Sequence, residues 1–223
     1  MISSIQRYPE AFKISQCTLD YCQCSAYPLD IEKIITDYKE ARIIVISETL
    51  YKQFRLETHQ TKPYLKIKDG RTYYDPKRDI YTIVYNDSLP LTRIRFTLAH
   101  EFAHIVLNHL SDTRTEINRG GLPDSVYYAY EGEANAFAGN FLVPPIILDD
   151  RSSGRLEKAQ TIATAFNVSR QSVVDFRIID YKYWKRLKTS TEEFRILRRY
   201  RRRFRLHLCR QCNALFSIRK SNY

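Results

Sequence analysis

The sequence predicts an α+β fold, in which a small mixed or antiparallel sheet packs on a helical core and a mainly helical, basic region follows. Three observations support it. Short runs of β-branched and aromatic residues lie before residue 90, two long stretches with helical spacing follow, and basic residues gather near the C-terminus. We therefore expect one domain over residues 1–150 and a second, helical region over residues 151–223.

Composition and charge narrow the class of protein. The chain has 223 residues, 43% of them hydrophobic, which is typical of a globular protein. It has no apolar run of the roughly 18 residues that cross a membrane and no apolar N-terminal signal, so we expect a cytoplasmic protein without a membrane partner. Residues 151–223 hold 19 of the 36 Lys and Arg but 5 of the 25 Asp and Glu, a net charge of +14, which leaves −3 for residues 1–150.

Residues 1–40 form a helical lead-in, with helix-compatible spacing over residues 3–14 and 30–38. Three of the five cysteines lie between these stretches, at Cys17, Cys22 and Cys24. A reducing cytoplasm disfavours disulfides, and this spacing matches no standard metal site. We therefore favour structural thiols over metal ligands here.

The predicted sheet comes from three places in the sequence. Residues 41–47 are rich in β-branched side chains, and residues 79–85 form a similar run that leads towards Pro90. Between them, residues 64–68 alternate in polarity and precede Asp69-Gly70, a turn signal. We expect residues 71–74 to return from that turn as the hairpin partner of residues 64–68.

A helix predicted from about Leu91 to Leu110 carries the sequence His-Glu-x-x-His. His100 and His104 are four residues apart, so they lie one turn above each other on one helix face and can reach one metal ion. Glu101 can lean over the open side of that metal and accept a proton from its water. The flanking residues are apolar, and buried histidine and glutamate side chains are costly unless something binds them. This pattern predicts Zn²⁺ bound by His100 and His104, with Glu101 as the catalytic base.

A third ligand is expected on a second helix, over residues 125–143, because catalytic zinc sites usually take three protein ligands. Glu131 and Glu133 compete for this role. Glu131 shares a face with small residues one turn on, whereas Glu133 points roughly 200° around the helix and is better placed for solvent. We expect Glu131, with Glu133 as the alternative, and Asn135 as a possible hydrogen-bond partner of a ligand histidine.

Both helices together resemble the ImmA/IrrE metallopeptidases, over roughly residues 40–150. The resemblance is carried by Arg-Ile-Arg-Phe-Thr-Leu-Ala-His-Glu-Phe-Ala-His-Ile-Val-Leu-Asn-His at residues 93–109 and Tyr-Glu-Gly-Glu-Ala-Asn-Ala-Phe-Ala-Gly-Asn-Phe-Leu-Val-Pro at residues 130–144. Two motifs in the family's order are more specific than His-Glu-x-x-His alone. In the wider gluzincin group a small residue and then Asp or Asn follow the ligand glutamate at three and four residues, a register that Glu131 fits. Ala103 stands where the family commonly has Gly.

The resemblance implies a zincin-like core and a cytoplasmic zinc peptidase that cleaves transcriptional repressors of the helix-turn-helix type, in phage, mobile-element or stress-response circuits. The alternative is a non-catalytic regulator that binds DNA or a partner protein, as in a toxin–antitoxin-like pair. A second donor for the oxyanion is expected as well. Its candidates are Tyr127, Tyr128, Tyr130 and His109. His109 matches a histidine often present in the family, but on a continuous helix it lies on another face from His104 and is not expected to bind the metal.

The remaining segments give weaker predictions. Residues 111–124 form a polar loop that is either a lid or a solvated connection. Residues 156–178 fit two short helices joined at residues 167–169, which either bind DNA through Arg170 and Gln171 or, as we favour, pack on the catalytic domain. Residues 195–205 hold seven arginines and could bind nucleic acid, and Cys209 and Cys212 form half of a zinc ribbon.

Overall fold

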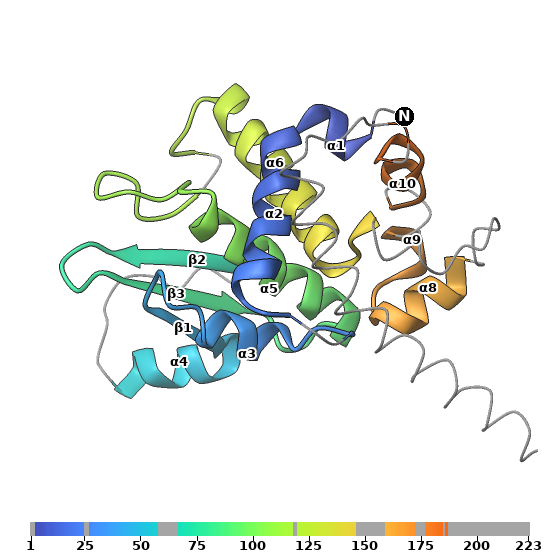
Figure 1. The fold of residues 1–223 in the computed structure, drawn as a ribbon. Helices are drawn as coiled ribbons and strands as arrows, with labels where there is room; N and C mark the ends of the chain where they lie inside the picture. Colours follow the sequence, from blue (N-terminus) through green and yellow to red (C-terminus); the bar gives the residue numbers. More distant parts are fainter. Residues whose placement is uncertain are drawn as a thin grey trace, which may run out of the picture.

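A three-stranded sheet lies beside a set of packed helices, and the helix that carries His100 and His104 runs between them (Figure 1). The computed structural model describes residues 3–24, 27–57, 67–117, 120–145, 159–172, 177–184 and 186. Its mixture of helices and a small sheet confirms the predicted α+β class. None of the described helices is long and apolar enough to cross a membrane.

The sheet has the order β1-β3-β2, with β1 at Ile43–Ser47, β2 at Gly70–Asp75 and β3 at Ile80–Tyr85. β1 pairs with β3 in parallel, and β2 pairs with β3 antiparallel, so the sheet is mixed, as the fold class predicted. The side chains of Ile83 and Val84 in the central strand are fully buried. Among the described strands β2 lies at one edge of the sheet, and both β2 and β3 contact the histidine-bearing helix.

The predicted hairpin between residues 64–68 and 71–74 is wrong. β2 pairs instead with β3, in the register Thr72 to Ile83, and the connecting turn is residues 76–79. Asp79 adopts a left-handed backbone with φ of 52°, which Asp tolerates better than most residues and which closes this turn. Ile67 and the two residues after it belong to no strand, and residues 61–66 lie outside the described part. Asp69 therefore precedes β2 and Gly70 begins it, paired with Tyr85 of β3, so this pair does not turn the predicted hairpin.

The helical lead-in consists of α1 (Ser4–Arg7), α2 (Pro9–Tyr21) and α3 (Ile31–Thr36). Ser3 caps α1 and Asp30 caps α3 through their side-chain oxygens, and Pro9 begins α2. α2 continues to Tyr21, so Cys17 lies on a helix instead of between helices. Cys17 is exposed and Cys24 is buried. A further helix, α4 (Glu48–Glu57), was not predicted.

The core is formed where α5 (Leu91–Val106) packs on α6 (Asp124–Leu142), and both helices were predicted to within a few residues. Phe102 of α5 and Phe137 and Phe141 of α6 are fully buried and pack ring against ring. α2 lies across α6, where Gly132 leaves room for the ring of Tyr8. This packing fixes the side of α6 that faces His100 and His104.

Two short helices, α8 (Ala159–Phe166) and α9 (Arg170–Ser172), and the later α10 (Ile178–Trp184) lie beside this core. Asn167 turns the chain between α8 and α9 with φ of 51°, and Ser169 Oγ accepts a hydrogen bond from Ser172 N–H and so caps α9. Phe166 is fully buried against Tyr27, 4.9 Å between ring centroids. α8 therefore packs on the same core as α5, and the boundary at residue 150 stays a prediction.

Candidate metal centre

Three side chains from two helices converge on one point. His100 and His104 lie one turn apart on α5, and their Nε2 atoms are 3.2 Å apart. Glu131 on α6 faces them, with one carboxylate oxygen 3.5 Å from His100 Nε2 and the other 3.5 Å from His104 Nε2. Among the residues that the structure describes, these three form the group whose ligand atoms are close enough to hold a metal ion.

The spacing of these atoms fits a tetrahedral zinc site. With zinc–ligand bonds of about 2.0–2.1 Å, tetrahedral ligand atoms are separated by about 3.3–3.4 Å. The separations here are 3.2 Å between the two histidine nitrogens and 3.5 Å from each nitrogen to Glu131. Two nitrogens and one carboxylate, with a fourth direction open to a pocket, are the donor set of a catalytic zinc site. We keep the ligand roles of these residues as a proposal.

Glu101 lines the same pocket, which has a volume of about 430 Å³. Its side chain is almost buried, at 8% exposed, and Thr72 Oγ1 of β2 donates a 2.8 Å hydrogen bond to Glu101 Oε2. Gly70 brings β2 this close, because a Cβ there would lie 2.4 Å from Thr97 Cγ2. The edge strand therefore holds one oxygen of Glu101 in place beside the two histidines.

Comparison with known proteins agrees with this geometry. The profile of the IrrE N-terminal-like domain, Peptidase M78, matches residues 51–178. The chain belongs to this family. The IrrE-like domain thus includes β2, β3, α5 and α6, and it extends through α8 and α9. The resemblance seen in the sequence is confirmed, and membership indicates a metallopeptidase-like protein that uses a metal, typically zinc.

No curated protein matches the chain. Among solved structures, one described as a Mycobacterium tuberculosis transcriptional regulator is 15% identical, with a TM-score of 0.46 over 75% of this chain and 46% of that one. The IrrE-like chain therefore spans less than half the length of that protein.

At the site of this IrrE-like domain, the carboxylates and the histidines stabilise one another's charged forms and shift one another's pKa values. Burial alone would raise the pKa of Glu131, but hydrogen bonds and charge from His100 and His104 outweigh it, and the pKa is lowered. Burial alone would lower the pKa of His100, but the hydrogen bond to Glu131 and the charges of Glu101 and Glu131 outweigh it, and the pKa is raised. The carboxylate of Glu131 is therefore ionised near neutral pH, as a metal ligand must be.

Asn135, one turn beyond Glu131, lies where the sequence suggested. Its Oδ1 is 3.0 Å from His100 Nδ1. When Nδ1 donates its proton to this amide oxygen, the lone pair of His100 is on Nε2, the atom that faces Glu131. Asn135 thus orients the His100 ring so that Nε2 faces Glu131.

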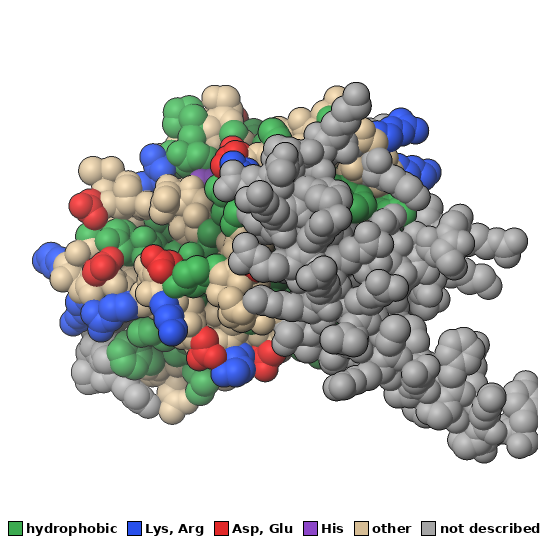
Figure 2. Space-filling view, viewed as in Figure 1, with side chains coloured by type: hydrophobic (Ala, Val, Ile, Leu, Met, Phe, Trp, Pro, Cys, Tyr) green, Lys and Arg blue, Asp and Glu red, His purple; other side chains and the backbone are tan. Residues whose placement is uncertain are grey.

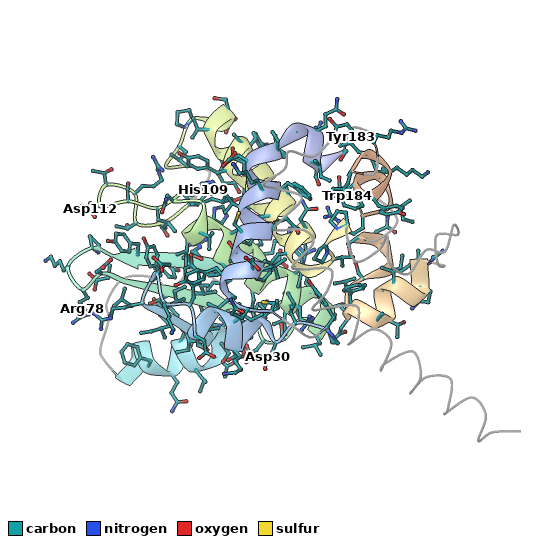
Figure 3. The ribbon with its side chains drawn as sticks, in the orientation of Figure 1. Asp30, Arg78, His109, Asp112, Tyr183 and Trp184 are labelled. Carbon is teal, nitrogen blue, oxygen red and sulfur yellow. The ribbon has the colours of Figure 1, made fainter. Side chains whose placement is uncertain are left out.

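Sequence reasoning missed the surroundings of His104. His109 Nδ1 lies 2.9 Å from His104 Nδ1, and Glu133 Oε2 lies 3.0 Å from His109 Nε2. Glu133, predicted as the alternative ligand or as a solvated residue, contacts this third histidine instead. His109 lies among the side chains between the end of α5 and α6, with Asp112 farther out on the loop (Figure 3). Burial and the positive charges of His104 and Arg114 lower the pKa of His109 to about 3, so its ring is neutral at neutral pH.

The sequence feature that brings His109 to His104 lies at the end of α5. Asn108 adopts a left-handed backbone with φ of 55°, Asn108 N–H donates to Ile105 O, and His109 N–H donates to His104 O. This is a Schellman motif, in which the chain reverses after the helix. His109 thereby returns to the side of His104, whereas a helix continued to Leu110 would place it elsewhere. Asn is the commonest residue after Gly at such a position, so Asn108 was the available clue.

The four candidates for an oxyanion donor differ in position. Tyr127 lines the pocket with His100 and Glu131. Tyr130 stacks on His109, 4.2 Å between ring centroids, and its hydroxyl accepts a hydrogen bond from Arg114. Tyr128 is 53% exposed. The geometry therefore favours Tyr127 for this role, and it stays a proposal.

The exposed surface carries side chains of mixed type. On the face shown in Figure 2, hydrophobic and charged side chains are interspersed. His104 and His109 are each 2% exposed. Arg170 and Gln171 at the start of α9 are exposed. The arginine-rich residues 195–205, together with Cys209 and Cys212, lie outside the described residues.

Proposed function

We propose that this protein is a zinc-dependent endopeptidase that cleaves a helix-turn-helix transcriptional repressor, in the cytoplasm, and so relieves repression in a phage, mobile-element or stress-response circuit. The observation that carries the peptidase assignment is Glu101, an almost buried carboxylate held by Thr72 on the wall of the pocket that also contains His100. Family membership supports a metallopeptidase. The repressor as substrate follows from the family resemblance.

The residues divide the proposed chemistry between them. His100, His104 and Glu131 would hold Zn²⁺. Bound zinc would lower the pKa of a coordinated water towards neutrality and polarise the carbonyl of the scissile peptide. Glu101 accepts a proton from the attacking water at the carboxylate oxygen that Thr72 leaves unbound. As the carbon–nitrogen bond breaks, Glu101 passes this proton to the leaving amine, and the water's oxygen stays on the new carboxyl group.

A regulator that only binds DNA or a partner protein remains the second candidate. A metal used as a structural scaffold needs no carboxylate beside its open position, so Glu101 favours the peptidase. The basic segment that would favour nucleic-acid binding lies outside the described residues.

The decisive experiment compares wild type with Glu101→Gln. Each purified protein is mixed with Zn²⁺ and the helix-turn-helix repressor encoded nearest to its gene, and cleavage is followed by mass spectrometry. Glu101→Gln removes the proton acceptor but no ligand, so we expect the cleavage rate to fall by about 10²–10⁴-fold at unchanged zinc content. Glu32→Gln, the same change on the exposed face of α3, is the control. If wild type and Glu101→Gln leave the repressor equally intact, the peptidase proposal loses its support.

A further inference from the structure

His109 and Glu133 are not among the three candidate metal ligands. His109 nevertheless lies at hydrogen-bonding distance from His104, and Glu133 lies at hydrogen-bonding distance from His109. The contacts run from His104 Nδ1 to His109 Nδ1 over 2.9 Å and from His109 Nε2 to Glu133 Oε2 over 3.0 Å. We refer to His104, His109 and Glu133 as the outer chain. His104 and His109 are each 2% exposed, whereas 39% of the Glu133 side chain is exposed, so the chain leads from the metal centre to the surface.

We propose that His109 and Glu133 are positioning residues that set the proton and the ring orientation of His104, so that His104 presents a free Nε2 lone pair to the metal. This inference rests on the proposed metal site. It assigns a role in the reaction to two residues that neither bind the metal nor touch the substrate.

The carboxylate of Glu133 determines which ring nitrogens of His109 and His104 carry a proton. A carboxylate can only accept, so the proton of His109 lies on Nε2, facing Glu133. His109 Nδ1 then carries a lone pair and must accept from His104 Nδ1. This places the proton of His104 on Nδ1 and leaves Nε2, 3.2 Å from His100 Nε2, without one. The opposite direction would set the lone pair of His109 Nε2 against the carboxylate of Glu133.

The fold holds the middle residue of the outer chain rigidly. The Schellman motif at the end of α5 ties His109 N–H to His104 O over 2.9 Å. The ring of Tyr130 stacks on the His109 ring at an interplanar angle of 12°, and Arg114 Nη1 donates to His109 O over 2.7 Å. Backbone, ring plane and carbonyl of His109 are therefore fixed independently of the metal.

The two candidate histidine ligands are supported unequally. His100 is oriented by the neutral amide of Asn135, an exposed residue, whereas the support of His104 ends on a carboxylate. A carboxylate at the end of the outer chain makes the metal-facing nitrogen of His104 a stronger donor than an amide would. Loss of the outer chain should therefore weaken metal binding and distort the arrangement of the ligands around the metal.

The test measures Zn²⁺ affinity by competition with a chromophoric chelator, and ligand geometry from the visible absorption of Co²⁺ in the same site. His109→Leu removes both hydrogen bonds, and we expect about 10–100-fold weaker Zn²⁺ binding and an altered Co²⁺ spectrum. His109→Asn retains an acceptor near the Nδ1 position and should restore part of the affinity. Leu110→Ala removes buried packing from the neighbouring residue without a change in the outer chain. It should lower the melting temperature and leave the Zn²⁺ affinity as it is.

Glu133→Leu provides a second test from the exposed end, where substitution leaves the core intact. It should weaken Zn²⁺ binding in the same direction, and Glu133→Gln, whose amide oxygen still accepts from His109, should weaken it less. Folded His109→Leu and Glu133→Leu that bind Zn²⁺ as tightly as wild type, with the same Co²⁺ spectrum, overturn the inference. Wild type that binds no Zn²⁺ overturns the proposed metal site itself, a result distinct from the first.

Discussion

At the scale of single residues, the contact that most directly prepares the proposed chemistry is the one between Thr72 and Glu101. Thr72 Oγ1 lies 2.8 Å from Glu101 Oε2, and both side chains are buried. A hydroxyl that donates to one carboxylate oxygen restricts rotation of the whole carboxylate. The other oxygen receives no hydrogen bond from Thr72, and Glu101 lines the pocket in which the proposed chemistry takes a proton from water.

Thr72→Val replaces this hydroxyl with a methyl group of nearly the same size. We expect the cleavage rate to fall by about tenfold, because a hydrogen bond to a charged group contributes about 1.5–3 kcal/mol and part of that is lost in orienting Glu101. Zn²⁺ affinity should stay unchanged, since no candidate ligand is altered. Thr72→Ser keeps the hydroxyl and should retain most of the activity. Steady-state rates for the three proteins decide this prediction, and equal rates for Val and Thr would contradict it.

The convergence of His100, His104 and Glu131 could be expected from the sequence because the information for it is local, and their roles as ligands stay a prediction. The spacing of His100 and His104 on one helix predicts that both reach one point, and the helix-face comparison chose Glu131 over Glu133. The outer chain could not be predicted in the same way. Its geometry depends on where α5 ends, and a helix continued beyond Val106 carries His109 away from His104.

At the scale of elements, β2 and α5 approach each other closely only because of Gly70. A Cβ at this position would lie 2.4 Å from Thr97 Cγ2 and 3.1 Å from Glu101 Cγ. Real side-chain carbons do not approach this closely, so any larger residue must push β2 away from α5. The distance between the edge strand and Glu101 therefore depends on a single missing side chain.

Gly70→Ala should destabilise the protein by about 1–3 kcal/mol, the usual cost of overpacking a core, and should reduce activity by shifting Thr72. Thr97→Ser removes the methyl group that is most in the way. The double variant Gly70→Ala/Thr97→Ser should therefore recover much of the stability lost in Gly70→Ala. Urea unfolding of the wild type, both single variants and the double variant measures the coupling. Additive effects of the two substitutions would show that this contact does not limit the approach of β2.

The elements themselves were predictable to different degrees. Residues 41–47 and 79–85 form β1 and β3 because their β-branched side chains suit a half-buried sheet wherever it pairs. The predicted pairing partner of β2 was wrong. The prediction relied on Asp69-Gly70, a strong local turn signal, whereas the actual pairing depends on contacts with β3, farther along the chain. In the structure Asp69 is instead held by Arg93 of α5, with Nη2 2.8 Å from the carboxylate.

At the scale of the whole molecule, the two ends of the described chain hold α6 in place. Tyr8 packs against Gly132, the residue after Glu131, and the guanidinium of Arg177 packs against Gly139, about two turns farther along the same helix. Arg177 also donates to Asn140 Oδ1 over 2.9 Å. The helix that carries Glu131 is therefore held by two segments that are far apart in the sequence.

Asp180 connects these segments. Its carboxylate is fully buried, lies 2.7 Å from Arg177 Nη2, and accepts hydrogen bonds from Ser3 Oγ at 2.6 Å and Ser4 N–H at 2.7 Å. Arg177 is 4% exposed, and burial lowers its pKa. α10 and the N-terminus of α1 thus share one buried charge pair.

Asp180→Asn should destabilise the protein by about 3–5 kcal/mol, because it leaves Arg177 buried without its counter-charge. Replacing both partners, as in Arg177→Met/Asp180→Leu, removes that uncompensated charge and should recover a large part of the loss. Urea unfolding compares these variants with Glu40→Gln, an exposed carboxylate that accepts a hydrogen bond from Tyr21 and should change stability by less than about 1 kcal/mol. If Asp180→Asn were as stable as Glu40→Gln, the Arg177–Asp180 ion pair would not be the contact that joins α10 to the start of α1.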